Sequence, residues 1–190
     1  GSQTFEIQDV PGIAKVAREH GVLTMIDNTW ASPLYFQPLK HGVNISIHSA
    51  TKYIAGHSDC SLGVAVFETE ELWSRMKRLT NDNGSCAAPD MCYLGLRGLR
   101  TLDVRLERHY KNALIVAKWL QGRGEVSRVF FPPLPEDPNN ALWRRDFRGA
   151  CGLFSFEFRR ELDNKGLAAF VNWLEYFPLG FSWGGDKSLA

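Results

Sequence analysis

Lys52 lies just past a short apolar segment and beside two hydroxyl side chains, Ser49 and Thr51. A strand that ends near such a lysine would hold the amine on rigid backbone, and an activated lysine amine forms an imine with an aldehyde. Hydroxyl and backbone N–H groups in a turn donate hydrogen bonds to phosphate. The segment therefore favours a Schiff-base lysine that serves a phosphate-bearing aldehyde. Taken alone, Lys52 is more simply explained as a surface lysine among ordinary turn residues.

Asp27 directly follows a neighbouring apolar segment, residues 22–26. If both segments are parallel strands, Asp27 and Lys52 converge at one edge of the sheet, where open α/β sheets bind ligands. A carboxylate beside a pyridine nitrogen keeps that nitrogen protonated, so the ring can withdraw electrons from a carbanion. The pair favours pyridoxal 5'-phosphate (PLP) as the cofactor, whereas Asp27 alone is more simply explained as a turn or N-cap residue.

Helices and strands alternate in the first half of the chain. Residues 10–20 have an apolar face at helical spacing, and Gly21 is a natural end for that helix. Short apolar runs separated by helices are typical of an α/β fold with a parallel or mixed sheet. We predict strands at residues 22–26, 44–48 and 63–67, helices at 70–79 and 90–99, and irregular connections at 33–42 and 81–89.

Near residue 100 the order of the predicted elements changes to helix, strand, loop, strand and helix. We predict a helix at 101–120, strands at 126–130 and 152–158, a surface connection at 132–138, a helix at 163–175 and a short strand at 179–182. This change predicts a domain boundary at residues 98–101. Residues 1–98 would be part of a large cofactor-binding domain, and residues 99–190 a long connecting helix with part of a smaller α/β C-terminal domain.

Composition excludes several other classes of protein. The chain has 190 residues, 44% hydrophobic and 23% charged, with a net charge of +1, so no strong field favours nucleic acid or an anionic membrane. No apolar run approaches the roughly 20 residues of a membrane helix, and the first ten residues do not resemble a signal peptide. The four cysteines form no CxxC pair, which favours reduced thiols in the cytoplasm and no zinc site.

Other polar and aromatic candidates are expected to be structural. His48, His57 and Asp59 could resemble metal ligands, but His48 ends a strand and Gly56 indicates a turn. We expect core packing for Trp119 and Trp173, and salt bridges in preference to phosphate contacts for Arg97 and Arg100.

Taken together, these segments resemble the Cys/Met-metabolism family of fold-type I PLP-dependent enzymes. The resemblance covers essentially the whole chain in order. It is carried by residues 1–6 (GSQTFE), 27–33 (DNTWASP), 49–53 (SATKY), 56–59 (GHSD), 97–102 (RGLRTL) and 182–185 (SWGG). It implies a transferase-like fold of type I, with a parallel or mixed sheet in the large domain.

The resemblance also implies a role for each residue of the two strand ends. Lys52 would form the Schiff base with PLP and then act as the general base at the substrate α-carbon. Asp27 would pair with the pyridine nitrogen, and Ser49 and Thr51 would contact the phosphate. Ser182 would contact the substrate carboxylate, and Trp183 would shape the substrate-binding pocket.

Two tryptophans resemble the β-acting members of the family. Trp30 and Trp183 are similar to residues of the cystathionine β-lyases, whereas γ-acting relatives more often carry Phe and Leu there. The implied reaction cleaves cystathionine, a sulfur amino acid, to homocysteine, pyruvate and ammonia in methionine biosynthesis. Alternatives are a γ-acting relative (cystathionine γ-synthase, γ-lyase or O-acetylhomoserine sulfhydrylase) and a non-catalytic truncated remnant.

Members of this family are about twice as long as this chain and are generally homotetramers. The glycine-rich phosphate loop, the aromatic residue that stacks on PLP and the arginine that binds the substrate carboxylate are not among these residues. We therefore expect little or no lyase activity from the 190 residues alone, whether they are a native fragment or a portion of a full enzyme.

Overall fold

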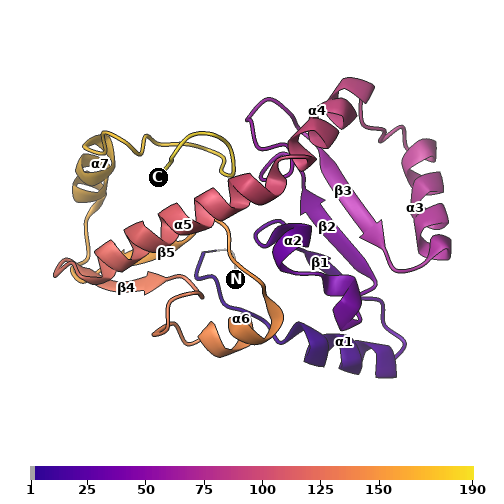
Figure 1. The fold of residues 1–190 in the computed structure, drawn as a ribbon, viewed down its shortest axis with the longest axis horizontal. Coiled ribbons are helices and arrows are strands. Elements are labelled where there is room, and N and C mark those ends of the chain that lie inside the picture. Colours follow the sequence, from indigo (N-terminus) through magenta and orange to yellow (C-terminus); the bar gives the residue numbers. More distant parts are fainter. Residues whose placement is uncertain (1–2) are drawn as a thin grey trace.

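Two small β-sheets and a long helix that extends between them organise the fold (Figure 1). The structure is a computed structural model and describes residues 3–190, so Gly1 and Ser2 of the first matching segment lie outside the described residues. The first sheet has the order β1-β2-β3 and the second pairs β4 with β5. The strands are β1 (Met25–Asp27), β2 (Ile45–Ser49), β3 (Gly63–Phe67), β4 (Val126–Phe130) and β5 (Ser155–Phe158).

The first sheet is mixed. β1 pairs with β2 in parallel, with Asp27 opposite Ile47, and β2 pairs with β3 in antiparallel, with Ser49 opposite Gly63. The carboxyl ends of β1 and β2 therefore lie at the same edge, as the sequence predicted. The α/β class with a parallel or mixed sheet is confirmed.

Helices precede and follow these strands along the chain (Figure 1). Thr69 and Asp163 cap the N-termini of α3 and α7, because their side chains accept hydrogen bonds from the N–H groups of Leu72 and Gly166. The helices are α1 (Val10–Glu19), α2 (Ser32–Tyr35), the 3₁₀ helix η1 (Pro38–His41), α3 (Glu70–Asp82), α4 (Pro89–Leu99), α5 (Leu102–Gln121), α6 (Asn140–Asp146) and α7 (Asn164–Asn172).

The helix α5 contributes to two parts of the core. Leu102 and Leu106 near its start are buried with the segment that carries Lys52, whereas Ala113 and Ala117 are buried against β4. A third cluster lies between α1 and the residues after β1, and Trp30 packs against all three clusters. No helix within residues 3–190 combines the length and apolar character needed to cross a bilayer.

Three predicted strands differ from the structure. The strand predicted at 152–158 begins only at Ser155. Residues 22–24 are not part of β1, because the Val22 N–H closes the end of α1 on the Ala17 carbonyl and the Thr24 N–H donates to the Asn44 side chain. Residues 179–182 form no strand, since the Gly180 N–H donates to the Ala190 carbonyl in a closing loop. At residues 22–24 and 179–182 these backbone donors are used by a helix end, a side chain and the closing loop, so neither segment is a strand.

Two further expectations need correction. The connection at 132–138 is only partly a surface loop, because Pro132 and Leu134 are fully buried. Trp119 and Trp173 do not pack in the core of the described residues, where they are 60% and 87% exposed.

The helices α2 and α6 were not expected, since each is shorter than the window over which helical periodicity can be recognised. The domain boundary near residues 98–101 stays a prediction.

Candidate functional site

Lys52 lies in a helical turn directly after β2. Its backbone N–H donates to the Ser49 carbonyl at 3.0 Å, and its own carbonyl accepts from the Gly56 N–H at 2.8 Å. The Thr51 N–H is tied to the Leu62 carbonyl at 3.0 Å, which fixes the turn against the segment before β3. The backbone of the predicted Schiff-base lysine is thus held on both sides.

The Lys52 amine reaches a segment from the far end of the chain. Its Nζ donates to the Ser182 Oγ at 2.7 Å and lies 5.2 Å from the centre of the Trp183 ring. Gly184 follows with a φ of +84°, and a Cβ there would lie only 3.0 Å from the backbone of Lys52 and Tyr53. Close approach and a left-handed backbone both require glycine at this position. The structure therefore brings together three residues that sequence reasoning named, Lys52, Ser182 and Trp183.

Asp27 lies at the end of β1 with an exposed side chain. Its Oδ1 accepts two hydrogen bonds from one residue, the Thr29 N–H at 2.9 Å and the Thr29 hydroxyl at 2.5 Å. Within residues 3–190 no group donates a hydrogen bond to its Oδ2, so one carboxylate oxygen faces outward for a partner. Asp27 and Lys52 share the edge of the sheet, but no hydrogen bond or ion pair joins them in the described chain.

Thr29 is a site residue that sequence reasoning missed. Besides donating to Asp27, its hydroxyl accepts a hydrogen bond from the Ser49 N–H at 2.8 Å. This buried hydroxyl thereby joins the ends of β1 and β2. The pairing depends on the register of the two strands, which the sequence alone does not state.

Ser49 and Thr51 differ in what their hydroxyls do. The Thr51 hydroxyl accepts from the Leu62 N–H at 2.9 Å and donates to the Leu62 carbonyl at 3.3 Å, so it is turned toward backbone. Across residues 3–190 the Ser49 hydroxyl makes no hydrogen bond. Ser49 is therefore the freer of the two predicted phosphate donors, and both roles stay predictions.

Arg105, in α5, holds the turn that carries Lys52 through hydrogen bonds, and the sequence did not predict this role. Its guanidinium donates to the carbonyls of Tyr53 at 2.7 Å, Ile54 at 3.1 Å and Gly98 at 2.7 Å. Burial lowers the pKa of Arg105. The arginine closes the C-terminal end of the turn that carries Lys52, because it binds the Tyr53 and Ile54 carbonyls there, and it joins this turn to α4 at Gly98.

Tyr53 fills the space behind the turn. Its side chain is buried, its hydroxyl accepts from the Gly152 N–H at 3.1 Å, and its ring packs 5.4 Å from that of Trp183. Burial raises the pKa of Tyr53 well above its usual value, so it stays a neutral phenol. Tyr53 is thus a packing residue between Lys52 and the rest of the core.

The two histidines near the site are structural, as expected. His48 is 3% exposed and shares a hydrogen bond of 3.0 Å with the Ser46 hydroxyl, and burial lowers the pKa of His48. His57 contacts the Ala55 carbonyl through Nδ1 at 2.6 Å. Asp59 pairs with Arg97 at 3.0 Å, which confirms the salt bridge expected for that arginine. No three His, Cys, Asp or Glu side chains of residues 3–190 come together as a metal site.

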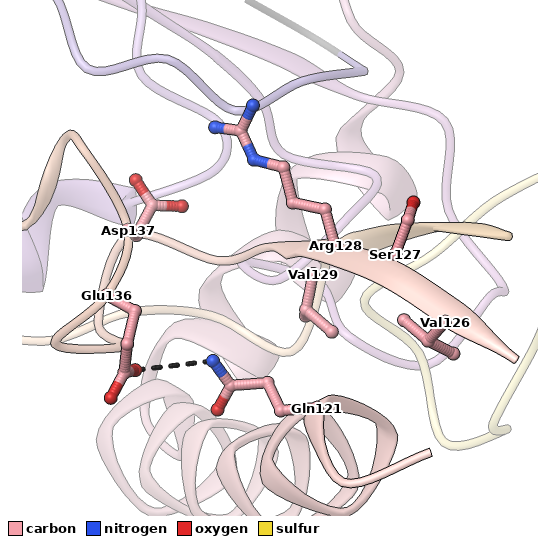
Figure 2. A pocket seen from close by; sticks show the side chains of 7 residues that line it. All are labelled: Gln121, Val126, Ser127, Arg128, Val129, Glu136 and Asp137. Carbon is pink, nitrogen blue, oxygen red and sulfur yellow. Dashed lines mark hydrogen bonds between the residues drawn. The ribbon is translucent and has the colours of Figure 1, made fainter. Parts of the chain in front are cut away.

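A pocket of about 210 Å³ lies away from the lysine, between α5, β4 and the following loop (Figure 2). Gln121 at the end of α5 donates to Glu136 at 3.3 Å across it, and Val129 points toward the helix. Arg128 points to the opposite side of the strand, where its guanidinium lies 4.3 Å from the Phe130 ring. The pocket contains none of the predicted site residues.

Comparison with known proteins gives a consistent result. The model of the family described as "Cys/Met metabolism PLP-dependent enzyme" matches residues 1–190. A protein of Rhizobium johnstonii with a provisional cystathionine β-lyase name is 54% identical over the whole chain and 48% of its own length. The L-alanine/L-glutamate racemase of Wolbachia pipientis wMel is 42% identical over the whole chain and 47% of its own length.

Solved structures agree in fold. The cystathionine γ-synthase of Xanthomonas oryzae pv. oryzae, in complex with cystathionine, superimposes with a TM-score of 0.95 at 39% identity. The match covers all of this chain and 48% of that one. The chain thus spans about half the length of the relatives it matches, and those relatives carry names of three different reactions on one scaffold.

Proposed function

Because the chain belongs to the Cys/Met metabolism PLP-dependent enzymes, we propose that it forms the lysine-bearing part of a PLP-dependent carbon–sulfur lyase. The observation that carries this proposal is the position of the Lys52 amine, whose Nζ lies 2.7 Å from the Ser182 Oγ and beside the Trp183 ring. This position is at the edge of the sheet where Asp27 ends β1. An amine held on rigid backbone beside polar partners is the arrangement that a Schiff-base lysine requires.

The donor set fits PLP. An amine, a carboxylate oxygen and a hydroxyl, the last two without a hydrogen-bond partner in the described part of the chain, match the aldehyde, the ring nitrogen and the phosphate of this cofactor in chemical type. These groups are Lys52 Nζ, Asp27 Oδ2 and Ser49 Oγ. When bound, PLP supplies a ring that withdraws electrons from the substrate α-carbon.

The protein residues would then bind, orient and move a proton. Lys52 Nζ would hold the cofactor aldehyde, and as a released amine it would take the α-proton of the substrate as general base. Ser182 accepts a hydrogen bond from that amine in the present structure and is available to a substrate carboxylate when the amine moves. Trp183 forms an apolar wall beside it. The turn bonds of Ser49 and Gly56 keep the Lys52 backbone fixed during this exchange.

Cleavage at the β-carbon is the reaction that we propose, with a cystathionine-like sulfur amino acid as substrate. Trp30 and Trp183 support it through their likeness to cystathionine β-lyases. The alternatives are γ-cleavage or γ-replacement and racemisation, since relatives at 39% and 42% identity carry such names. We further propose a homotetrameric assembly in the cytoplasm, on the family resemblance alone.

Trapping of the imine tests the cofactor site. The full-length protein is incubated with PLP, reduced with borohydride, digested and mapped by mass spectrometry. We expect a pyridoxyl adduct on the peptide that contains Lys52, lost in Lys52→Ala and kept in Lys40→Ala, a lysine in η1 with an exposed side chain. A folded protein without the adduct would instead support the non-catalytic remnant.

Product analysis tests the reaction. With cystathionine as substrate, β-cleavage yields pyruvate and homocysteine, whereas γ-cleavage yields 2-oxobutyrate and cysteine. With L-alanine alone, a racemase yields D-alanine and releases no keto acid. Pyruvate as the main product supports the β-lyase, and either of the other results replaces it.

A further inference from the structure

The Thr29 hydroxyl joins the two strand ends that carry the proposed cofactor residues. It donates to Asp27 Oδ1 at 2.5 Å and accepts from the Ser49 N–H at 2.8 Å. Thr29 itself is only 7% exposed. We propose that Thr29 is a positioning residue, which fixes the Asp27 carboxylate toward the cofactor ring nitrogen and couples it to the strand end that leads to Lys52. This inference rests on the proposed PLP site.

The orientation of Asp27 follows from how its two oxygens are used. Within residues 3–190 both donors to this carboxylate come from Thr29, and both reach the same oxygen, Oδ1. The rotation of the carboxylate is thereby fixed, and Oδ2 is left for the cofactor. A hydroxyl that donates to a carboxylate at such a distance makes a charge-assisted hydrogen bond, which is stronger than a neutral one.

The second bond of the hydroxyl explains why its position is stable. A hydroxyl has one hydrogen and two lone pairs. Here the hydrogen is directed to Asp27 on β1, and a lone pair faces the N–H of Ser49 at the end of β2. Because the Ser49 N–H has this one partner within the described chain, loss of the hydroxyl would also leave a backbone donor without its bond.

Two substitutions separate the hydroxyl from the shape of the side chain. Thr29→Val keeps the size and branching and the backbone N–H bond to Asp27, but removes the hydroxyl. Thr29→Ser keeps the hydroxyl and removes a methyl group. If the hydroxyl positions Asp27, valine should weaken PLP binding by about tenfold or more, and serine should stay within about threefold of wild type.

A PLP analogue in which C–H replaces the ring nitrogen distinguishes positioning from a general loss of structure. This analogue keeps the aldehyde and phosphate but offers Asp27 no partner. Binding of PLP and of the analogue to the apoprotein of the full-length chain is measured by absorbance titration, with circular dichroism as the check on folding. We expect Thr29→Val to weaken PLP binding about tenfold and analogue binding less than about threefold.

Other outcomes decide against the inference in separate ways. Equal losses for both ligands would mean that Thr29 only supports the fold, and no loss for PLP would mean that it does not position Asp27. Should Thr29→Val not fold, Thr29→Ala replaces it in the same comparison. If wild type binds PLP at Lys52 and the variants behave alike, the inference fails while the proposed function stands. If wild type forms no adduct at Lys52, both fail.

Discussion

Cys151 is the thiol most strongly affected by its surroundings. It is fully buried, and burial raises its pKa to about 12. The thiolate is the reactive form, so Cys151 should be inert at neutral pH. Cys86 is exposed in the loop after α3. We expect iodoacetamide to label Cys86 in the folded protein and to leave Cys151 unmodified until urea is added, as measured by peptide mass mapping. Fast labelling of Cys151 without denaturant would contradict the packing described around Tyr53.

His48 predicts a pH dependence of stability. Burial lowers its folded-state pKa, so the unfolded chain binds a proton first as the pH falls. The stability contribution is therefore complete above pH of about 6.5 and is lost as the pH falls from there toward the lower folded-state value. His48→Gln should reduce the fall in unfolding free energy between pH 7.5 and 5, by at most about 1.4 kcal/mol per pH unit.

Urea unfolding of wild type and His48→Gln at both pH values measures this effect. Exposed His20 supplies the control variant, His20→Gln. Part of the slope will remain in His48→Gln, because burial and nearby Arg105 also lower the pKa of His109. An unchanged slope in His48→Gln would show that His48 is not held neutral.

At the scale of single residues, spacing predicted only part of the site. Lys52 and Asp27 were named because each follows an apolar run of strand length, and the structure does place both at one edge of the sheet. Thr29 and Arg105 were not found, since their roles depend on hydrogen bonds between segments that only the folded register brings together. The chemical roles of Lys52 and Asp27 stay predictions.

At the scale of elements, α4 contacts the lysine turn at a glycine. A Cβ on Gly98 would lie 2.3 Å from the carbonyl oxygens of Ile54 and Ala55. Backbone atoms cannot move aside as a side chain does, so Gly98→Ala must displace α4 or the turn. We expect a loss of about 1–3 kcal/mol of unfolding free energy, measured by urea unfolding. Gly124→Ala, where a Cβ meets open space, should stay within about 0.5 kcal/mol.

Strand boundaries were predictable where the run of apolar residues ended at the same residue as the strand. The boundaries predicted for β3 and β4 agree with the structure, because both contain β-branched and aromatic residues that favour strands, namely Val64, Val66 and Phe67 in β3 and Val126, Val129 and Phe130 in β4. The prediction for β1 began too early, since apolar Val22 and Leu23 belong to the turn after α1. The strand expected at 179–182 was wrong for a comparable reason: its backbone bonds to the last residue described and not to a neighbouring strand.

At the scale of the whole molecule, Trp30 connects the parts. Its ring packs against all three core clusters, and its Nε1 donates to the Leu153 carbonyl at 2.9 Å. Trp30→Phe keeps an aromatic ring but leaves that carbonyl unpaired. We expect a loss of about 1–3 kcal/mol of unfolding free energy.

Thermal and urea unfolding measure this prediction. Trp119→Phe is the matched control, because Trp119 is 60% exposed and should change stability by less than about 0.5 kcal/mol. An unchanged stability of Trp30→Phe would show that Trp30 does not mainly join the clusters.

The hydrogen bond between Lys52 and Ser182 also has a consequence for synthesis on the ribosome. Its partners are 130 residues apart in the chain, so the lysine leaves the ribosome long before its serine exists. At about 5–20 residues per second the interval is roughly 7–26 s. Throughout that time the amine of the nascent chain lacks both the hydroxyl and the tryptophan ring that later cover it. The lysine is therefore open to free aldehydes before the site that governs its reactivity is complete.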